Sequence, residues 1–266
     1  MERTPILLVA ESGSDLSPTL AETYHVTIVP MHVTFGQETK PDGSFPPEEV
    51  CQFYAQTGTL PKTSGATLED FDTVFQHLHR EHPQAHILYL AYSAVTTCSF
   101  QCAQMAAEGK EYITCLDTKQ VSIGQGMVVV QTAKAIRQHP EWTVAAAQAI
   151  IQRANMCFVP SNLDFLRAGG RVSNAMALCG NLLKIHPCIE LVDGYLRATK
   201  RYRGPMARIA AQLVQDYAQR FSLDREVLWL GHTPGLPPEV RQAAEEAARQ
   251  LGFYQVQWVQ TGGVIT

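Results

Sequence analysis

The motifs that most often identify an enzyme are missing from this sequence of 266 residues. It contains no Walker A loop, no G-x-S-x-G elbow and no H-E-x-x-H pair. The short "GQG" run at 124–126 lacks the third glycine of a dinucleotide-binding loop. The sequence therefore gives no support for the nucleotide-binding, acyl-transfer or zinc-hydrolase chemistry that depends on these motifs.

Long apolar runs and strong charge are also missing. No run approaches the roughly 18 apolar residues of a membrane span, and "ILLVA" at 6–10 is too short and poorly flanked for a signal peptide. Hydrophobic residues make up 45% of the chain, charged residues 17%, and the formal net charge is −4. We expect a folded cytoplasmic protein without stable membrane insertion and without a nucleic-acid partner.

Paired metal or disulfide ligands are absent as well. The seven cysteines are an odd number and form no C-x-x-C pair, so we expect reduced, mostly buried thiols. The run "HLHREH" at 77–82 is rich in possible ligands, but on a helix His77 and His79 point about 200° apart. A solvated helix end is the preferred interpretation, and we predict no metal site.

Short β-rich runs alternate with helical patterns through the first half of the chain. The runs are 6–10, 26–35, 86–91 and 113–117, and the helical patterns begin near Ser17, Pro47, Thr67, Ser99 and Ser122. This alternation predicts an α/β fold with a mostly parallel sheet covered by helices.

A second domain is predicted to begin near residue 160. Two strand-like runs meet at Asp193-Gly194, a hairpin signal, and apolar residues then recur at helical spacing from Met206 to Tyr217. A strand, a helix and a strand follow in 226–260. We therefore predict an α/β domain at 1–160 and a smaller mixed α/β domain at 161–266.

Hydroxyl-rich junctions mark the place where chemistry is expected. Three follow strands, at 11–18, 92–99 and 117–124, and a fourth, 60–71, enters a helix without an obvious preceding strand. Such loops gather at the carboxyl edge of a parallel sheet, where hydroxyls and free helix amides suit an anion. The same residues could instead be helix N-caps, Thr67 with Asp70 and Ser14 or Ser17 in particular.

Seven blocks together resemble the DegV family of bacterial fatty acid-binding proteins. The blocks are "ESGSDLSP", "KTSGAT", "YSAVTTCSFQCA", "CLDTKQVSIGQG", "DGYLRATKRYRG", "HTPGLPPE" and "LDFLRAGGRVSNAMALCGNLLKIHP". The resemblance covers nearly the whole chain, and the last of these blocks is the most specific. It implies a two-domain α/β protein that holds a long-chain fatty acid in a narrow tunnel.

The resemblance also implies the residues that bind the ligand. The carboxylate would be held by the hydroxyls of Thr63, Ser64 and Ser93 and by the amide near Ala94. A separate fatty acid kinase would transfer phosphate from ATP to this carboxylate, giving acyl phosphate for phospholipid synthesis. The binding protein would then be no enzyme and would need neither cofactor nor metal.

Two arginines are candidates for interaction with that kinase. Gly169 and Gly170 permit a tight helix exit, which would present Arg171 as a permanent cation; Arg203 lies in "KRYRG". Arg171 could equally cap carbonyls at the end of its helix.

Three departures from the family pattern affect the predicted pocket. Glu11 stands where aspartate is usual, and Thr96 to Ser99 replace leucine-serine-glycine-threonine, so Cys98 takes a glycine position. The sequence stops at "TGGVIT", where the family continues to a histidine that commonly contacts the carboxylate. Either that tail is missing here or the head group is bound differently.

A rival function comes from another class of protein. A substrate-binding subunit resembling dihydroxyacetone kinase would bind a small carbonyl compound through a covalent histidine adduct. His32, His186 and His232 are available, but none lies in the hydroxyl-rich loops of the sequence. Fold analogy alone does not separate the two functions.

Overall fold

The computed structural model describes residues 4–139, 142, 144–161, 163–170 and 185–266. The chain forms two compact units, each of which is discontinuous in sequence. The first comprises Met1–Met156, Leu191–Tyr195 and Thr261–Thr266, and the second comprises Cys157–Glu190 and Leu196–Gln260. The division into domains at 1–160 and 161–266 stays a prediction.

A four-stranded parallel sheet forms the centre of the first unit. Its order is β2-β1-β6-β7, and every neighbouring pair is parallel, which confirms the predicted sheet type. The strands are β1 (Ile6–Glu11), β2 (Val26–Val29), β6 (His86–Ala91) and β7 (Ile113–Asp117).

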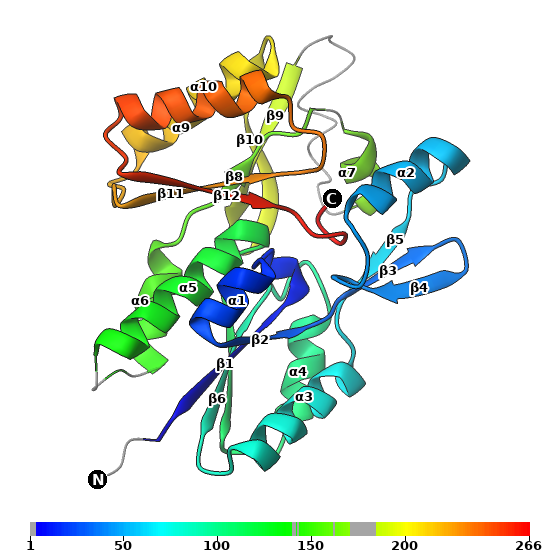
Figure 1. Ribbon diagram of the computed structural model, residues 1–266, viewed down its shortest axis with the longest axis vertical. Helices are drawn as coiled ribbons and strands as arrows, with labels where there is room; N and C mark the ends of the chain where they lie inside the picture. The colour runs from blue at the N-terminus through cyan, green and yellow to red at the C-terminus, as the bar shows by residue number, and fades with distance from the viewer. Residues whose placement is uncertain (1–3, 140–141, 143, 162, 171–184) are drawn as a thin grey trace. The chain divides into compact units, whose positions relative to one another are not determined.

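Helices cover both faces of this sheet, because its strands alternate apolar side chains between the two sides. On one side Val9 and Tyr89 pack against α3 (Leu68–Glu81) and α4 (Ser99–Ala107). On the other, Leu8 and Leu90 pack against α5 (Ser122–Gln138) and α6 (Val144–Arg153), as the two groups of helices in Figure 1 show. This is the layered α/β arrangement that the alternating sequence predicted.

Two of the predicted N-caps are present. The Ser17 hydroxyl accepts a hydrogen bond from the Leu20 amide at the start of α1 (Pro18–Tyr24). Thr67 and Asp70 form a reciprocal capping box at the start of α3, in which the Asp70 carboxylate accepts the Thr67 amide at 2.7 Å. The hydroxyls at these two helix starts therefore do serve as caps.

The β-rich run at 26–35 forms two strands, since the structure divides it at Pro30. β2 ends at Val29, and β3 (His32–Phe35) belongs to a separate antiparallel sheet of order β4-β3-β5. Proline has no amide hydrogen to donate to a ladder, which explains the change of sheet. The other members are β4 (Glu38–Pro41) and β5 (Lys62–Ser64); η1 (Ser12–Ser14) and α2 (Glu48–Thr57) complete this part of the chain.

The second unit contains most of a three-stranded sheet and a parallel strand pair. The sheet has the order β10-β9-β8, and β11 pairs with β12 beneath α9 and α10. The bounds are β8 (Cys157–Phe158), α7 (Asp164–Gly169), β9 (Ile185–Val192), β10 (Tyr195–Arg203), α9 (Met206–Arg220), β11 (Val227–His232), α10 (Pro238–Gln250) and β12 (Gln255–Gln260).

The turn between β9 and β10 confirms the predicted hairpin. Asp193 and Gly194 are its two central residues, with φ of 50° and 83°. Two successive positive φ values are typical of the type I′ turn, which favours Asp-Gly. Among the helices of the described residues, none has both the length and the apolar composition needed to cross a membrane.

Candidate functional site

Polar loops follow the parallel strands where those strands end together. β1 ends at Glu11 and β7 at Asp117, on either side of β6 in the sheet. The loops after β6 and β7 are joined directly, because the Ser93 amide donates to the Gln120 carbonyl at 2.9 Å and the Thr118 hydroxyl donates to the Ala91 carbonyl at 2.7 Å. The expected convergence of polar loops is therefore present at this edge.

Glu11 holds the loop after β6 in place through hydrogen bonds. Its fully buried carboxylate accepts hydrogen bonds from the Tyr89 hydroxyl, from the Tyr92 amide at 3.1 and 3.2 Å, and from Gln125 Nε2 at 2.7 Å. Burial raises the pKa of Glu11, and these donors oppose that rise. Glu11 is a positioning residue for the backbone that leads into Ser93.

Ser93 and Ala94 are both engaged with neighbouring groups. The fully buried Ser93 hydroxyl donates to the Gly194 carbonyl at 2.8 Å. The Ala94 amide donates to Asp117 Oδ1 at 3.3 Å, and that oxygen also accepts the Lys119 amide at 2.8 Å. Both groups have the donors expected for a carboxylate, but in this state each donor is used within the protein.

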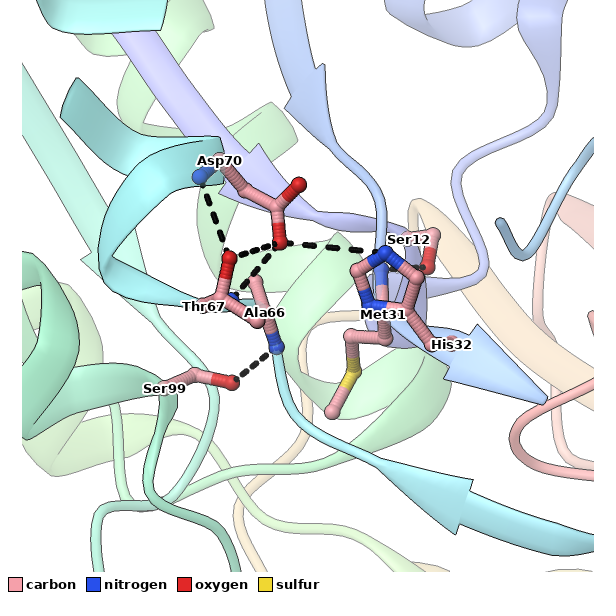
Figure 2. Close-up of polar contacts among 7 residues, drawn as sticks. All are labelled: Ser12, Met31, His32, Ala66, Thr67, Asp70 and Ser99. Atoms are coloured by element: carbon pink, nitrogen blue, oxygen red, sulfur yellow. Dashed lines mark hydrogen bonds and ion pairs between the residues drawn. The ribbon is translucent and has the colours of Figure 1, made fainter. Parts of the chain in front are cut away.

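The segment 62–66 lies against the loop at 97–99. Ser99 Oγ accepts the Ala66 amide at 3.0 Å, as Figure 2 shows, and its own amide donates to the Thr97 hydroxyl at 3.4 Å. A Cβ atom on Gly65 would lie 2.3 Å from Thr97 Oγ1, so only glycine permits this close approach. Two of the predicted loops are thereby brought together.

Thr63 and Ser64 lie on β5, the strand that the sequence did not reveal. They pair with Val33 and His32 of β3. Thr63 is half-buried and Ser64 is exposed, and neither hydroxyl has a hydrogen-bond partner within the described residues. These two hydroxyls are therefore available to a ligand, in contrast to that of Ser93.

His32 lies closer to these segments than its place in the sequence suggests. It is opposite Ser64 in the β3–β5 register, and its Nε2 lies 3.8 Å from Asp70 Oδ2 (Figure 2). The neighbouring Met31 amide donates to the Ser12 hydroxyl at 3.0 Å, which joins the loop after β1 to the same region. His32 lies in none of the hydroxyl-rich loops of the sequence, and it is strand pairing that places it opposite Ser64.

Two buried aspartates hold the segment Thr261–Thr266 in the first unit. Asp15 Oδ1 accepts the Gly262 amide at 2.7 Å, and Asp42 Oδ1 accepts the Gly263 amide at 2.8 Å. Burial raises the pKa of Asp15 to about 7, with Asp42 adding to the rise and the Gly262 and Ser122 hydrogen bonds opposing it. The sequence did not reveal these contacts with 261–266, since Gly262 and Gly263 are more than 200 residues from the two aspartates.

The candidate residues for kinase interaction belong elsewhere. Arg203 is exposed and is the last residue of β10 in the second unit. Arg171 lies outside the described residues. Gly170, just before it, ends α7 with a φ of 66° and donates its amide to the Leu166 carbonyl at 3.1 Å, as expected for a glycine helix exit.

Together these features define a mixed α/β protein with hydrogen-bond donors at the carboxyl edge of a parallel sheet. The chain belongs to the DegV family, whose profile, described as an uncharacterised protein of the DegV family, matches residues 5–266.

Individual relatives agree with this assignment. A DegV domain-containing protein from Deinococcus radiodurans is 29% identical over 267 residues, covering 98% of this chain and 93% of that protein. The solved structure of a DegV family protein from Thermus thermophilus, described by its fatty acid binding, matches with a TM-score of 0.85 and 26% identity over 98% of this chain and 94% of its own. A fatty acid binding DegV family protein from Streptococcus agalactiae shares the fold, with a TM-score of 0.85, 22% identity, and 98% and 94% of the two chains covered.

Proposed function

We propose that this protein binds a long-chain fatty acid and presents its carboxylate to a separate kinase. The observation that carries the proposal is the full-length similarity to the Thermus thermophilus protein, whose description is fatty acid binding. The donors at 63–64 and 93–94 support it, because hydroxyls and amides are the neutral groups that hold a carboxylate in a partly buried site.

The present hydrogen bonds of the four residues indicate how each would bind the carboxylate. Thr63 and Ser64 have hydroxyls without partners among the described residues, so they can donate at once. Ser93 would rotate its hydroxyl from the Gly194 carbonyl to the ligand. The Ala94 amide would exchange a 3.3 Å contact with Asp117 for a shorter bond to the incoming carboxylate.

The acyl chain needs an apolar environment next to these donors. Ala66, two residues after Ser64, belongs to the buried cluster between the sheet and α3 and α4, together with Phe71 and Tyr89. Each methylene moved from water into such surroundings contributes about 0.8 kcal/mol. The chain would therefore supply most of the affinity, and the polar loops would fix the position of the carboxylate.

Substitution of the donors tests the head-group assignment. Loss of a hydrogen bond to a charged group costs about 1.5 to 3 kcal/mol, so Thr63→Ala and Ser93→Ala should each weaken fatty acid binding about 10- to 150-fold. Titration of delipidated protein with a fluorescent fatty acid measures this. Thr23→Ala is the matched control, because its hydroxyl donates to the Thr19 carbonyl within α1. Unchanged affinity in both site variants would refute the assignment.

The kinase step requires no catalytic group from this protein. A carboxylate oxygen attacks the terminal phosphorus of ATP on the kinase, the bond from that phosphorus to the bridging oxygen breaks, and ADP leaves. The carrier only positions the attacking oxygen and shields the acyl chain from water. Arg203, and Arg171 beyond the described residues, are the cations that we assign to this interaction.

The role of Arg203 is open to a direct test. Arg203→Ala should lower acyl-phosphate formation by a fatty acid kinase several-fold while leaving fatty acid affinity unchanged, because Arg203 is exposed and lies outside the polar loops. Arg249→Ala is the control, since this exposed arginine pairs with Glu246 on its own helix. A parallel fall in affinity and turnover would assign Arg203 to ligand binding or to the fold.

The rival reading as a carrier of a small carbonyl compound now has one candidate residue. His32 lies opposite Ser64, although its Nε2 faces the Asp70 carboxylate. Incubation with dihydroxyacetone, followed by measurement of the intact mass of the protein, decides between the small-carbonyl function and the fatty acid carrier. A mass increase that His32→Ala abolishes would favour the rival over the fatty acid carrier.

A further inference from the structure

Two thiols lie together at the start of α4. Cys98 is the N-cap residue of this helix and is exposed, and Cys102, one turn later, is half-buried. The Cys102 amide donates to the Cys98 carbonyl at 3.0 Å, so the turn between them is helical.

The Cα atoms of the two cysteines meet the requirement of a disulfide, whereas the Cβ atoms must come closer. In an α-helix the Cα atoms of residues i and i+4 lie about 6 Å apart, within the span of roughly 4.4 to 6.8 Å that a disulfide bridges. Their Cβ atoms lie about 5 to 6 Å apart, and a disulfide needs about 3.5 to 4.5 Å. Because Cys98 is at the end of the helix, a movement of this terminal residue toward Cys102 can close that difference. Residues in the middle of a helix would have to distort hydrogen bonds on both sides.

The environments of the two sulfurs differ in a way that separates their roles. Cys98 is the exposed residue of the pair. Cys102 packs against the buried cluster of α3 and α4, and burial, followed by the neighbouring Cys98, raises the pKa of its thiol. An exposed thiol beside a shielded one is the arrangement found when one cysteine attacks an oxidant and the other resolves the product.

We propose that Cys98 and Cys102 form a reversible disulfide when the protein meets hydrogen peroxide. The Cys98 sulfur attacks one peroxide oxygen, the O–O bond breaks, and Cys98 sulfenic acid and one water are formed. The Cys102 sulfur then attacks the Cys98 sulfur, the S–O bond breaks, and the departing hydroxide takes the Cys102 proton as a second water. Two thiols are oxidised by two electrons in all, and one peroxide is reduced.

A second thiol pair in the second unit serves as an internal comparison. Cys157 and Cys188 lie on the neighbouring strands β8 and β9, where Cys157 is opposite Glu190 in the register. However, Cys188 is only 1% exposed, and the neighbouring Cys188 thiol, followed by burial, raises the pKa of Cys157 far above its usual range. The same oxidant should therefore reach this pair much more slowly.

The disulfide would act on the ligand site through the residues on either side of Cys98. Thr97 and Ser99 contact Gly65 and Ala66, which continue from Thr63 and Ser64. A shift of Cys98 toward Cys102 moves Thr97 and Ser99 with it, and so moves the segment that carries the free hydroxyls. This consequence rests on the proposed fatty acid binding, whereas formation of the disulfide does not.

Peptide mapping tests the chemistry without any ligand. Cleavage after Arg80 and Lys110 releases residues 81–110, which contain Cys98 and Cys102 and no other cysteine. After treatment with peroxide, this peptide should lose the mass of two hydrogen atoms and regain it with a reductant, while the peptides holding Cys157 and Cys188 stay reduced. Cys102→Ser should instead accumulate a Cys98 sulfenic acid that dimedone traps, and Cys98→Ser should give neither product.

Fatty acid titration of the same samples tests the consequence. Affinity should fall several-fold on oxidation, recover on reduction, and remain unchanged by peroxide in Cys98→Ser. A peptide 81–110 that stays reduced, or a dimedone adduct in the wild type equal to that of Cys102→Ser, would overturn the disulfide. Complete oxidation with unchanged affinity would overturn the coupling, and reduced protein that binds no fatty acid would refute the proposed function alone.

Discussion

At the scale of single residues, buried carboxylates hold the segments of this site together through hydrogen bonds. Glu11 accepts hydrogen bonds from a tyrosine, an amide and a glutamine, and Asp15 and Asp42 accept the amides of Gly262 and Gly263. Each joins segments that are distant in the sequence. Buried acids of this kind are costly to ionise, so they also make the protein sensitive to pH.

Asp15 should make the free energy of unfolding fall between about pH 4 and pH 7. Its pKa is about 7 in the folded protein against an ordinary value of 3.8, so in this interval the folded state holds a proton that the unfolded state has lost. The contribution of Asp15 to the free energy of unfolding is fully present below the ordinary pKa. It is lost as the pH rises through the pKa of the folded protein, and the loss is a few kcal/mol in total. Asp15→Asn should remove this part of the pH dependence.

Urea unfolding of both proteins from pH 4 to pH 8 measures the effect. Asp224→Asn is the control, since this exposed carboxylate only accepts the Glu226 amide in a turn. Glu11, whose pKa is also raised by burial, leaves some slope of the same sign in the Asp15 variant. A difference between wild type and Asp15→Asn that stays constant with pH would contradict the account.

At the scale of elements, the β9–β10 turn is the contact on which Ser93 depends. Gly194 has a φ of 83°, and a Cβ atom there would lie 2.6 Å from Ser93 Oγ. Gly194→Ala should therefore lower the free energy of unfolding by about 1 to 3 kcal/mol and weaken fatty acid binding, because it combines backbone strain with displacement of Ser93.

Gly235→Ala separates these two causes. Gly235 has a φ of 80°, but no atom lies within 4 Å of the Cβ position, so the variant keeps the strain without the crowding. It should destabilise the protein by about 1 kcal/mol and leave fatty acid affinity intact. Equal losses of affinity in the two glycine variants would show that the turn does not act through Ser93.

The sequence predicted elements well where local patterns decide the structure. Runs 86–91 and 113–117 became β6 and β7 with those bounds, and Thr67 and Asp70 formed the expected capping box. It failed where tertiary pairing decides. β5 has three residues and no apolar alternation, and its place is set by pairing with β3, so no strand before Thr67 could be predicted from the sequence.

The same limit applies to the site. Hydroxyl-rich loops could be located from the sequence because strand ends are visible in it. Their partners could not, since Ser93 bonds to Gly194, 101 residues away, and Gly65 meets Thr97 through a fold that brings β5 to α4. The residues Thr63, Ser64, Ser93 and Ala94 stay a prediction for head-group binding.

At the scale of the whole molecule, membership of the DegV family and similarity over 98% of the chain to a fatty acid-binding structure unite these local features. A sheet edge with neutral donors next to an apolar cluster suits a ligand with one charged end and a long apolar body. A fatty acid carrier needs none of the catalytic motifs that are missing from the sequence. The chemistry belongs to the partner kinase in our proposal.

The identity of the bound ligand tests this central claim most directly. Purified protein that has never been delipidated should be denatured in organic solvent and its extract analysed by mass spectrometry. The account predicts a long-chain fatty acid at about one molecule per chain, and its loss from Thr63→Ala or Ser93→Ala protein prepared in parallel. Consistent absence of fatty acid, or a small carbonyl compound attached to His32 in its place, would contradict it.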